Sequence, residues 1–209
     1  MTTKLPDSEK RKQIVDRSRA LFLERGFSAL SMGDIASLQG ISKKTLYRYF
    51  PNKAALSEAA IEERIVEVVA EIQRIADDRS LPLLRRLRGV LGVVSRQIAA
   101  LGDTLVKDLY YHYPELWERI DKFRRERVFG VITGLFEEGI REGYFRREIE
   151  PRLVPLLFLN AMATVMTPAQ LVSLPIPPVQ VFDAFFRILF GGILAEDARR
   201  QFFSEEDTI

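Results

Sequence analysis

Apolar residues recur at intervals of three and four along almost the whole chain, which is the spacing that places them on one face of an α-helix. One such series runs from Leu84 to Leu101 and another from Phe182 to Leu194. Alternating apolar and polar runs joined by Asn-Gly or Asp-Gly turns, which are typical of β-hairpins, do not occur. The pattern therefore predicts an all-α fold.

Glycine, proline and polar clusters divide this pattern into about nine helices. The first three form a small head, and the others form a larger helical body. We expect the helices at residues 9–25, 32–39, 43–49, 53–77, 82–101, 103–112, 115–143, 151–172 and 178–199.

Charge is unevenly spread over the 209 residues, although the formal net charge is only +2. Residues 1–53 contain 11 Lys and Arg against 5 Asp and Glu, whereas residues 54–209 contain 20 against 24. A basic head on a mildly acidic body predicts a region that binds a polyanion, attached to a region with another task. We therefore divide the chain into domains at 1–53 and 54–209.

The chain has no cysteine and a single histidine, His112. Disulfides, thiolate metal sites and cysteine nucleophiles are thereby excluded, and an enzyme would need His112 as its general base. We expect no catalytic residue, no metal site and no cofactor. Two interpretations of His112 stay open: a ligand-contacting or pH-sensing group, or an ordinary residue at the end of a helix.

The most apolar stretch, residues 154–166, is 13 residues long, and the first residues of the chain are polar and charged. A bilayer span needs about 20 apolar residues. We therefore expect neither a signal peptide nor a membrane partner, and a cytoplasmic location.

Residues 31–53 carry the local signals of two short helices joined at a glycine. Ser31 with Asp34 three residues later is a capping-box pattern, and Ser42 is a favourable N-cap for the second helix. Gly40 lies where the first helix has to end in a left-handed conformation. This arrangement predicts a helix-turn-helix.

Burial of Leu46 and Phe50, four residues apart, decides which side chains of the second helix face outward. Lys43, Lys44, Tyr47 and Arg48 lie on its other sides, with the Thr45 hydroxyl nearby. The first turn of such a helix is the part that touches base edges in the major groove. Lysine donates to guanine acceptors, and a threonine methyl meets a thymine methyl.

The pattern formed by Phe27, residues 31–36, residues 40–42, the run Thr-Leu-Tyr-Arg-Tyr-Phe at 45–50, and Asn52–Lys53 resembles the TetR family of bacterial transcriptional regulators. The resemblance is specific over about residues 9–56. It implies a homodimer that binds a palindromic DNA operator, and most members repress transcription until a small molecule binds the body.

The resemblance also implies roles for individual residues in the head. Ser31, Tyr47, Tyr49 and Lys53 match positions that contact the phosphate backbone, and residues 42–45 match positions that approach bases. Many members carry glycine or proline where Lys44 stands, so we expect Lys44 to read a base through its side chain. The expected DNA-binding residues are Ser31, Ser42, Lys43, Lys44, Thr45, Tyr47, Arg48, Tyr49 and Lys53.

Two charged groups outside the motif leave their role open. Arg11, Lys12, Arg17 and Arg19 reach phosphates beside the operator, or they form an ordinary solvated helix face. Glu137, Glu138 and Glu142 lie close together along one helix, as catalytic carboxylates do. However, no histidine or metal cluster accompanies them in the sequence. We expect these glutamates to form a solvated face.

The body offers an interface and a ligand site. The wide apolar face from Phe182 to Leu194 predicts a homodimer through helices 151–172 and 178–199, which together with their partners form a four-helix bundle. The alternative is that these helices pack within one chain. Adaptable or large apolar side chains are expected to line a pocket for a small-molecule effector: Leu105, Tyr110, Trp117, Phe129, Phe158, Met162 and Met166.

The sequence thus favours a sequence-specific DNA-binding regulator, most simply a repressor released from its operator by a small apolar or aromatic ligand. An activator of the same family is a variant of this hypothesis. The hypotheses from other classes are a helical enzyme and a helical module that binds a protein partner through the Phe182–Leu194 face.

Overall fold

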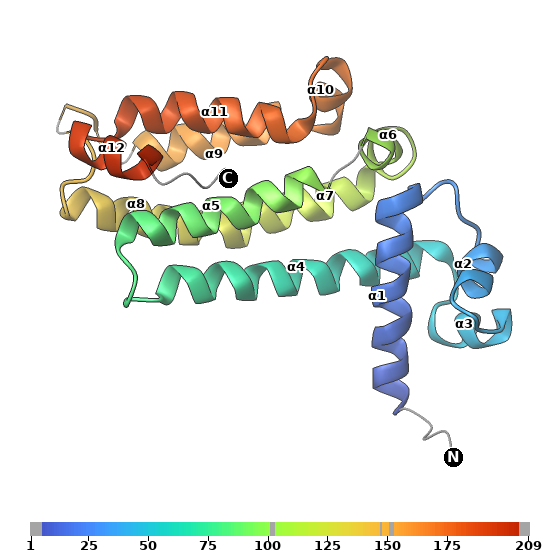
Figure 1. Cartoon of the computed structure of the whole chain (residues 1–209). Coiled ribbons are helices and arrows are strands. Elements are labelled where there is room, and N and C mark those ends of the chain that lie inside the picture. Colours follow the sequence, from blue (N-terminus) through green and yellow to red (C-terminus); the bar gives the residue numbers. More distant parts are fainter. Residues whose placement is uncertain (1–5, 101–102, 147, 151–152, 205–209) are drawn as a thin grey trace.

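The computed structural model describes residues 6–100, 103–146, 148–150 and 153–204. In the first half of the chain its helices follow the predicted ranges closely (Figure 1). They are α1 (Asp7–Arg25), α2 (Met32–Leu38), α3 (Lys43–Tyr49), α4 (Lys53–Asp77), α5 (Leu83–Ala99) and α6 (Asp103–Tyr111). The ends of two predicted helices, at residue 101 and at residues 151 and 152, lie outside the described residues.

The second half is also helical. Its elements are α7 (Pro114–Phe123), the π-helical segment η1 (Arg124–Val128), α8 (Phe129–Arg141), α9 (Leu153–Val165), α10 (Pro168–Ser173), α11 (Pro178–Ile193) and α12 (Glu196–Ser204). The described residues contain no strand, and their one isolated bridge pairs Phe145 with Leu194. The all-α prediction is confirmed.

Three of the predicted helices are divided in the structure. Helix 115–143 is interrupted by η1, and π-helical turns of this kind commonly occur as single insertions in α-helices. Helix 151–172 ends before Thr167, whose hydroxyl accepts the amide hydrogen of Gln170 and caps α10. Helix 178–199 is broken at the extended Leu194, because the next amide, that of Ala195, donates to the carbonyl of Tyr144.

The single long helix α4 connects the head, made of α1 to α3, with the body (Figure 1). In the body, α4, α5, α8, α9 and α11 run along similar directions, while α1 crosses the end of this bundle. The helix-turn-helix is therefore carried at one end of the molecule.

Two apolar clusters hold the molecule together. The head cluster joins Leu46, Phe50 and the first turns of α4 to residues of α6 and α7, including Leu105 and Leu116. The body cluster begins further along α4, at Val68. The packing of the head thus continues beyond the predicted boundary after residue 53, because one helix serves both clusters.

Phenylalanines form the centre of the body cluster. The rings of Phe186 and Phe190 lie 4.5 Å apart, and the ring of Phe190 stacks at 5.3 Å on that of Phe202 from α12. Phe182 is buried in the same cluster. The expectation that the wide apolar face from Phe182 to Leu194 is an exposed interface is therefore wrong for these rings, since the chain covers them itself.

A buried ion pair fastens α5 to α8. The guanidinium of Arg86 donates to both carboxylate oxygens of Glu138 and to the carbonyl of Ala76, and Arg79 reaches the same carboxylate from the surface. The hydrogen bond from Arg86 lowers the pKa of Glu138 from 4.5 to about 2. The expectation of a solvated face is wrong for Glu138, although Glu137 and Glu142 are exposed.

Within the described residues, no single helix is both long and apolar enough to cross a bilayer. Among the described helices, only Leu83–Ala99 and Thr104–Tyr111 reach that length and composition as a pair, and they are inclined by 77° to each other.

Candidate nucleic-acid interface

Capping hydrogen bonds fix the starts of the two short helices of the head. The Ser31 hydroxyl accepts the Asp34 amide at 3.2 Å, and the Asp34 carboxylate accepts the Ser31 amide at 2.9 Å. The Ser42 hydroxyl accepts the Thr45 amide at 3.0 Å. The predicted capping box and N-cap are confirmed, so amides that would otherwise lack a partner are satisfied at the starts of both helices.

The turn and the inner face are also as predicted. Gly40 has a φ of +66°, a conformation that costs glycine little. Leu46 and Phe50 are fully buried in the head cluster. Burial of these two side chains fixes the rotation of α3 about its own axis, and this rotation decides which side chains reach the surface.

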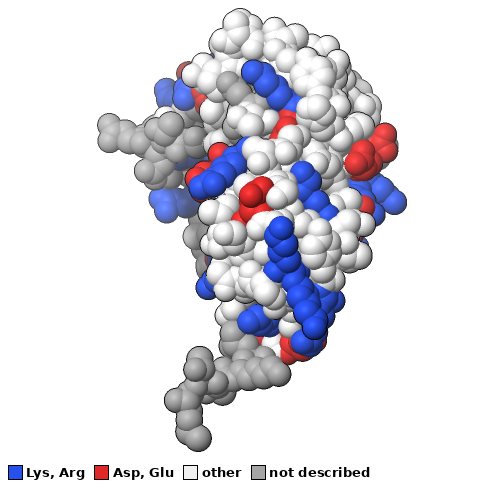
Figure 2. Space-filling view, turned by 90° about the vertical axis from the view of Figure 1, so that its right-hand side faces the viewer, with Lys and Arg blue, Asp and Glu red and all other residues white. Residues whose placement is uncertain are grey.

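The outer face of α3 carries the expected cations. Lys43, Lys44 and Arg48 are exposed, and Tyr47 keeps 50% of its surface accessible. Figure 2 shows this side of the molecule, where basic side chains form a column down the lower half, with acidic side chains above it and at its lower end. A rigid helix with several cations and a phenol on its outer face suits an electrostatic contact with a nucleic acid.

Lys43 lies over the beginning of α2. A Cβ atom at Gly33 would come within 2.8 Å of the Lys43 Cε atom, so the end of the lysine side chain lies directly on this glycine. The Asp34 carboxylate lies close to this lysine, and its pKa is held below the ordinary value mainly by the hydrogen bond from the Ser31 hydroxyl. The capping box therefore keeps a negative charge beside the Lys43 ammonium group.

Asp7, at the start of α1, binds two of the expected DNA contacts. Its carboxylate accepts Arg48 Nη2 at 2.6 Å and the Tyr49 hydroxyl at 2.5 Å. The hydrogen bond to Asp7 raises the pKa of Tyr49. The sequence analysis missed Asp7, because it lies about 40 positions before its partners and outside the helix-turn-helix pattern.

Three other expected contacts already have partners within the chain. Lys53 Nζ donates to the carbonyls of Phe27 and Leu30 at 2.9 and 3.0 Å, so its ammonium group is not free. The Ser31 hydroxyl is bonded to Asp34, and the Thr45 hydroxyl lies 2.8 Å from that of Ser42. A contact from any of these side chains to DNA stays a prediction.

Two of the α1 arginines bind α4. Arg11 pairs with Glu63 at 2.9 Å, and Arg19 pairs with Glu67 at 2.8 Å. These pairs connect α1 with α4, and a contact from either arginine to a flanking phosphate stays a prediction. Arg17 donates to the carbonyl of Gln39, at the end of α2.

The structure does not bring the seven expected ligand-binding side chains together. Leu105 and Trp117 belong to the head cluster, whereas Phe158, Met162 and Met166 are buried in the body cluster. Tyr110 is exposed and Phe129 is half-buried. None of the seven lines either of two described pockets, one of about 410 Å³ beside α6 and one of about 620 Å³ beside Phe145.

His112 is exposed just after α6, with its ring 6.3 Å from that of Tyr111. It lines neither of these two pockets. Among the described residues, no group of three histidine or carboxylate side chains is placed to hold a metal ion.

Comparison with known proteins gives related regulators along most of the chain. Residues 14–60 match the sequence profile of the family described as bacterial regulatory proteins, tetR family. The chain is 26% identical over 186 residues to an uncharacterized HTH-type transcriptional regulator of Bacillus subtilis, YvaF, and the alignment covers 89% of this chain and 96% of that protein. It is also 26% identical over 199 residues to the HTH-type transcriptional repressor KstR2 of Mycobacterium tuberculosis, covering 90% and 95%.

Solved structures share the fold. The transcriptional regulator FadR from Bacillus subtilis, solved in complex with stearoyl-CoA, superposes with a TM-score of 0.57 at 17% identity. The superposition covers 85% of this chain and 96% of that one. The likeness therefore extends over head and body, well beyond the matched residues 14–60.

Proposed function

Given that this chain belongs to the TetR family of bacterial transcriptional regulators and is a DNA-binding regulator, we propose that it acts as a repressor. In this proposal a homodimer binds a palindromic operator through its two heads, residues 1–53, and leaves it when a small apolar or aromatic ligand binds the body, residues 54–209. A protein with this task belongs in the cytoplasm, where its operator and effector are.

The observation that carries the proposal is the outer face of α3. Lys43 and Lys44 are exposed at the first turn of a helix whose start is capped and whose rotation is fixed by buried Leu46. The first turn of a recognition helix meets base edges, and side chains further along meet phosphates. We assign base contacts to Ser42, Lys43, Lys44 and Thr45, and phosphate contacts to Ser31, Tyr47, Arg48, Tyr49 and Lys53.

The exposed sides of α9 and α11 support a twofold dimer. Leu153, Leu156 and Leu157 are exposed on α9, and Ile188 keeps 77% of its surface accessible on α11. These are unusual positions for large aliphatic side chains in water. Two copies of this surface form a four-helix bundle, and a twofold axis then sets two recognition helices about 34 Å apart, in successive major grooves.

The effector is proposed to be apolar because the body is rich in aliphatic and aromatic side chains. The solved regulator FadR from Bacillus subtilis holds stearoyl-CoA, which is an acyl compound. A ligand needs to change operator affinity by only about 1–3 kcal/mol, or five- to 150-fold, to act as a switch.

Operator binding by lysine variants tests the proposal. With DNA from the upstream region of the protein's own gene, Lys43→Ala and Lys44→Ala should each cost about 1–3 kcal/mol if the side chain reads a base. Lys122→Ala, a change on exposed α7 away from the head, is the matched control. Loss at one base position indicates readout, and equal loss on all sequences indicates phosphate contact. Unchanged binding by both head variants would refute the interface.

A reporter gene placed behind the same upstream region separates repressor from activator. We expect expression to rise when the protein is absent. Expression that falls instead would show activation and would contradict the repressor assignment while leaving the DNA interface intact.

A further inference from the structure

Two ion pairs join α1 to α4, which α1 crosses close to the head (Figure 1). Arg11 Nη1 lies 2.9 Å from Glu63 Oε1, and Arg19 Nη1 lies 2.8 Å from Glu67 Oε2. The arginines are eight residues apart on α1, or about 12 Å, and the glutamates are four residues apart on α4, or about 6 Å. Because the two contacts are separated along both helices, they oppose any change in the angle at which α1 crosses α4.

The carboxylate of Glu67 continues this contact into the body. Glu67 Oε2, which accepts a hydrogen bond from Arg19, also accepts one from Arg64 Nη1 at 3.1 Å. Arg64 Nε in turn donates to Gln97 Oε1 of α5 at 2.9 Å. Burial raises the pKa of Glu67, but the hydrogen bond from Arg64 and the charge of Arg19 outweigh this effect and hold the pKa below its ordinary value. One charged carboxylate therefore connects α1 of the head with α4 and α5.

The other ion pair reaches the recognition helix. The Arg11 guanidinium, which binds Glu63, also lies over the ring of Phe50, with its central carbon 5.0 Å from the ring centre. Phe50 is the C-cap residue of α3 and is buried in the head cluster. A guanidinium is attracted to the face of an aromatic ring at such a distance. The crossing of α1 and α4 is therefore connected directly with the end of α3.

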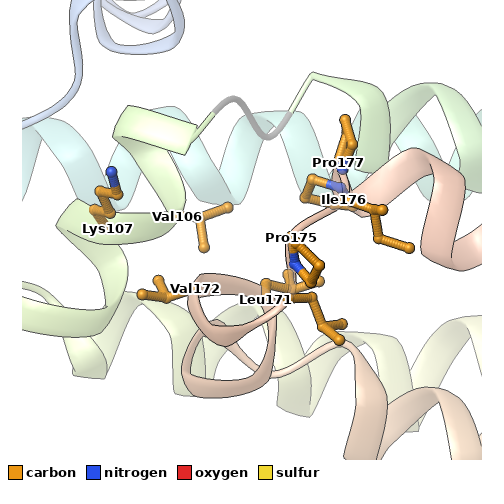
Figure 3. A pocket seen from close by; sticks show the side chains of 9 residues that line it. Val106, Lys107, Leu171, Val172, Pro175, Ile176 and Pro177 are labelled. Atoms are coloured by element: carbon orange, nitrogen blue, oxygen red, sulfur yellow. The ribbon is translucent and has the colours of Figure 1, made fainter.

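These ion pairs are separate from the pocket of about 410 Å³ beside α6. The walls of that pocket come from Val106 and Lys107 of α6 and from the segment 171–178 (Figure 3). None of these lining residues takes part in the two ion pairs at the crossing of α1 and α4. The network consists of side chains of the protein itself, so its effect on the head can be measured without a small molecule.

We infer that Glu67, held between Arg19 and Arg64, is a positioning residue that fixes the angle of the head on the body and thereby the spacing of the operator half-sites that the dimer accepts. The inference rests on the proposed function and adds a determinant of DNA specificity that does not itself touch DNA. Each base pair added between the half-sites moves them apart by about 3.4 Å and rotates one relative to the other by about 34°. Heads held at one angle therefore discriminate against a spacing that is wrong by one base pair.

Operators of altered spacing test the role of Glu67. The operator from the protein's own upstream region is compared with versions lengthened or shortened by one base pair between the half-sites. In Glu67→Gln, the ratio of the affinities for native and altered spacing should fall about two- to fivefold, the effect of losing a partly exposed ion pair. Glu71→Gln is the matched control, because Glu71 is 35% accessible against 37% for Glu67 but pairs with Arg96 of α5. It should keep the parent ratio. A parent ratio in Glu67→Gln would overturn the inference.

The variant Arg19→Gln separates positioning from direct contact with DNA. It should lower the spacing ratio as much as Glu67→Gln does, because both changes remove the same ion pair. The double variant should show no further decrease, as expected for two residues that act through one interaction. If Arg19→Gln binds all three operators more weakly but keeps the parent ratio, Arg19 contacts a phosphate and the positioning role is wrong.

Spin labels measure the angle of the head without DNA. The chain has no cysteine, so labels can be attached at Ser37→Cys on α2 and Glu137→Cys on α8, which are both exposed positions. Labelled chains are diluted into unlabelled chains so that only distances within one chain are measured. Glu67→Gln should broaden the distribution of distances between the labels, and Glu71→Gln should leave it unchanged. An equally narrow distribution in Glu67→Gln would overturn the inference.

The two measurements also separate the inference from the proposed function. If the parent protein binds no operator but Glu67→Gln broadens the distance distribution, the proposed function fails and the role of Glu67 in fixing the head stands. If the parent protein binds its operator and Glu67→Gln changes neither the spacing ratio nor the distribution, the function stands and the inference is wrong.

Discussion

The Lys53 ammonium group has partners within the chain that the local sequence does not predict. Its position matches a lysine expected to touch the DNA backbone, yet Lys53 Nζ is held by the carbonyls of Phe27 and Leu30, and its charge lies 5.8 Å from the centre of the Tyr113 ring. These partners come from a loop 23 and 26 residues earlier in the chain. No local pattern around Lys53 predicts where that loop passes.

We expect Lys53→Met to lower the free energy of unfolding by about 1–3 kcal/mol, because two partly buried carbonyls lose their donor. Urea unfolding measures this change. Lys44→Met is the matched control and should leave stability unaltered while weakening operator binding. A Lys53→Met variant that is as stable as the parent chain would contradict a stabilising role for the hydrogen bonds to Phe27 and Leu30.

In the proposed complex, Asp7 would compete with DNA for Arg48 and Tyr49. The Asp7 carboxylate accepts hydrogen bonds from Arg48 Nη2 at 2.6 Å and from the Tyr49 hydroxyl at 2.5 Å. These are the same donors that would bind an operator phosphate. We expect Asp7→Asn to raise operator affinity a few-fold and to steepen the slope of log affinity against log salt by about 0.9, the value for one added phosphate contact.

Titration of a labelled operator at several salt concentrations measures both quantities for Asp7→Asn. Glu9→Gln, two residues further along exposed α1, is the control for loss of one negative charge. If the two variants behave alike, the effect is one of net charge, and Asp7 has no special hold on Arg48.

At the scale of elements, local signals predicted the head well and long-range pairings were missed. The caps at Ser31 and Ser42 and the turn at Gly40 depend on residues within three or four positions. They can therefore be predicted from the local sequence. The division of predicted helix 151–172 at Thr167–Pro168 has a similar local signal, an N-cap residue followed by proline. The sequence analysis missed it because apolar residues continue on both sides. The extended Leu194 depends instead on Phe145 and Tyr144, about 50 residues earlier.

The candidate site divides in the same way. The outward direction of Lys43, Lys44 and Tyr47 follows from burial of Leu46 and was predictable. The partners of Arg48 and Lys53 come from distant segments, and the pocket beside α6 combines residues about 65 positions apart. Such neighbours are set by the path of the whole chain and have no signature in local spacing.

The Glu138–Arg86 pair makes the stability of the α5–α8 contact depend on pH. The pKa of Glu138 is about 2 in the folded protein and near 4.5 when unfolded. The folded pKa is the lower one, so the stabilisation is fully present above pH 4.5 and is lost as pH falls from 4.5 toward 2. It amounts to about 3 kcal/mol at neutral pH.

Glu138→Gln should therefore be about 3 kcal/mol less stable than the parent chain at pH 7, and the difference should shrink at pH 3. Urea unfolding at both pH values gives the comparison. Glu137→Gln changes the exposed neighbour on α8 and should have little effect at either pH. A Glu138→Gln deficit that is equal at pH 7 and pH 3 would show a packing effect rather than loss of the ion pair.

At the scale of the whole molecule, the sequence predicted an interface on the Phe182–Leu194 face, and the structure buries the phenylalanines of that face within the chain. Apolar residues cover most sides of α11. Its phenylalanines Phe182, Phe186 and Phe190 are buried because they pack in the body cluster, where Phe136 and Phe202 contact them. Ile188 is left outside. Which side of such a helix is buried depends on the other helices, so periodicity alone leaves it undecided.

We expect Leu157→Asp and Ile188→Asp to convert a dimer into monomers, because each places a charge in the proposed four-helix interface. Light scattering with chromatography measures the mass, and operator binding should fall with it. Val66→Asp, at a position on α4 that is 67% exposed, is the matched control and should remain dimeric. A parent chain that is monomeric at micromolar concentration would contradict the dimer and favour a protein partner for this surface.

The continuity of α4 has a mechanical consequence. Its first turns are packed in the head, its last turns are packed in the body, and Arg11 and Arg19 tie α1 to its middle. A helix of 25 residues is about 37 Å long at 1.5 Å per residue. A tilt of about 5° at its body end therefore carries the far end about 3 Å, roughly one base-pair step. In the proposed complex, a displacement of side-chain size at the body end of α4 would therefore shift the head by about one base-pair step along the DNA.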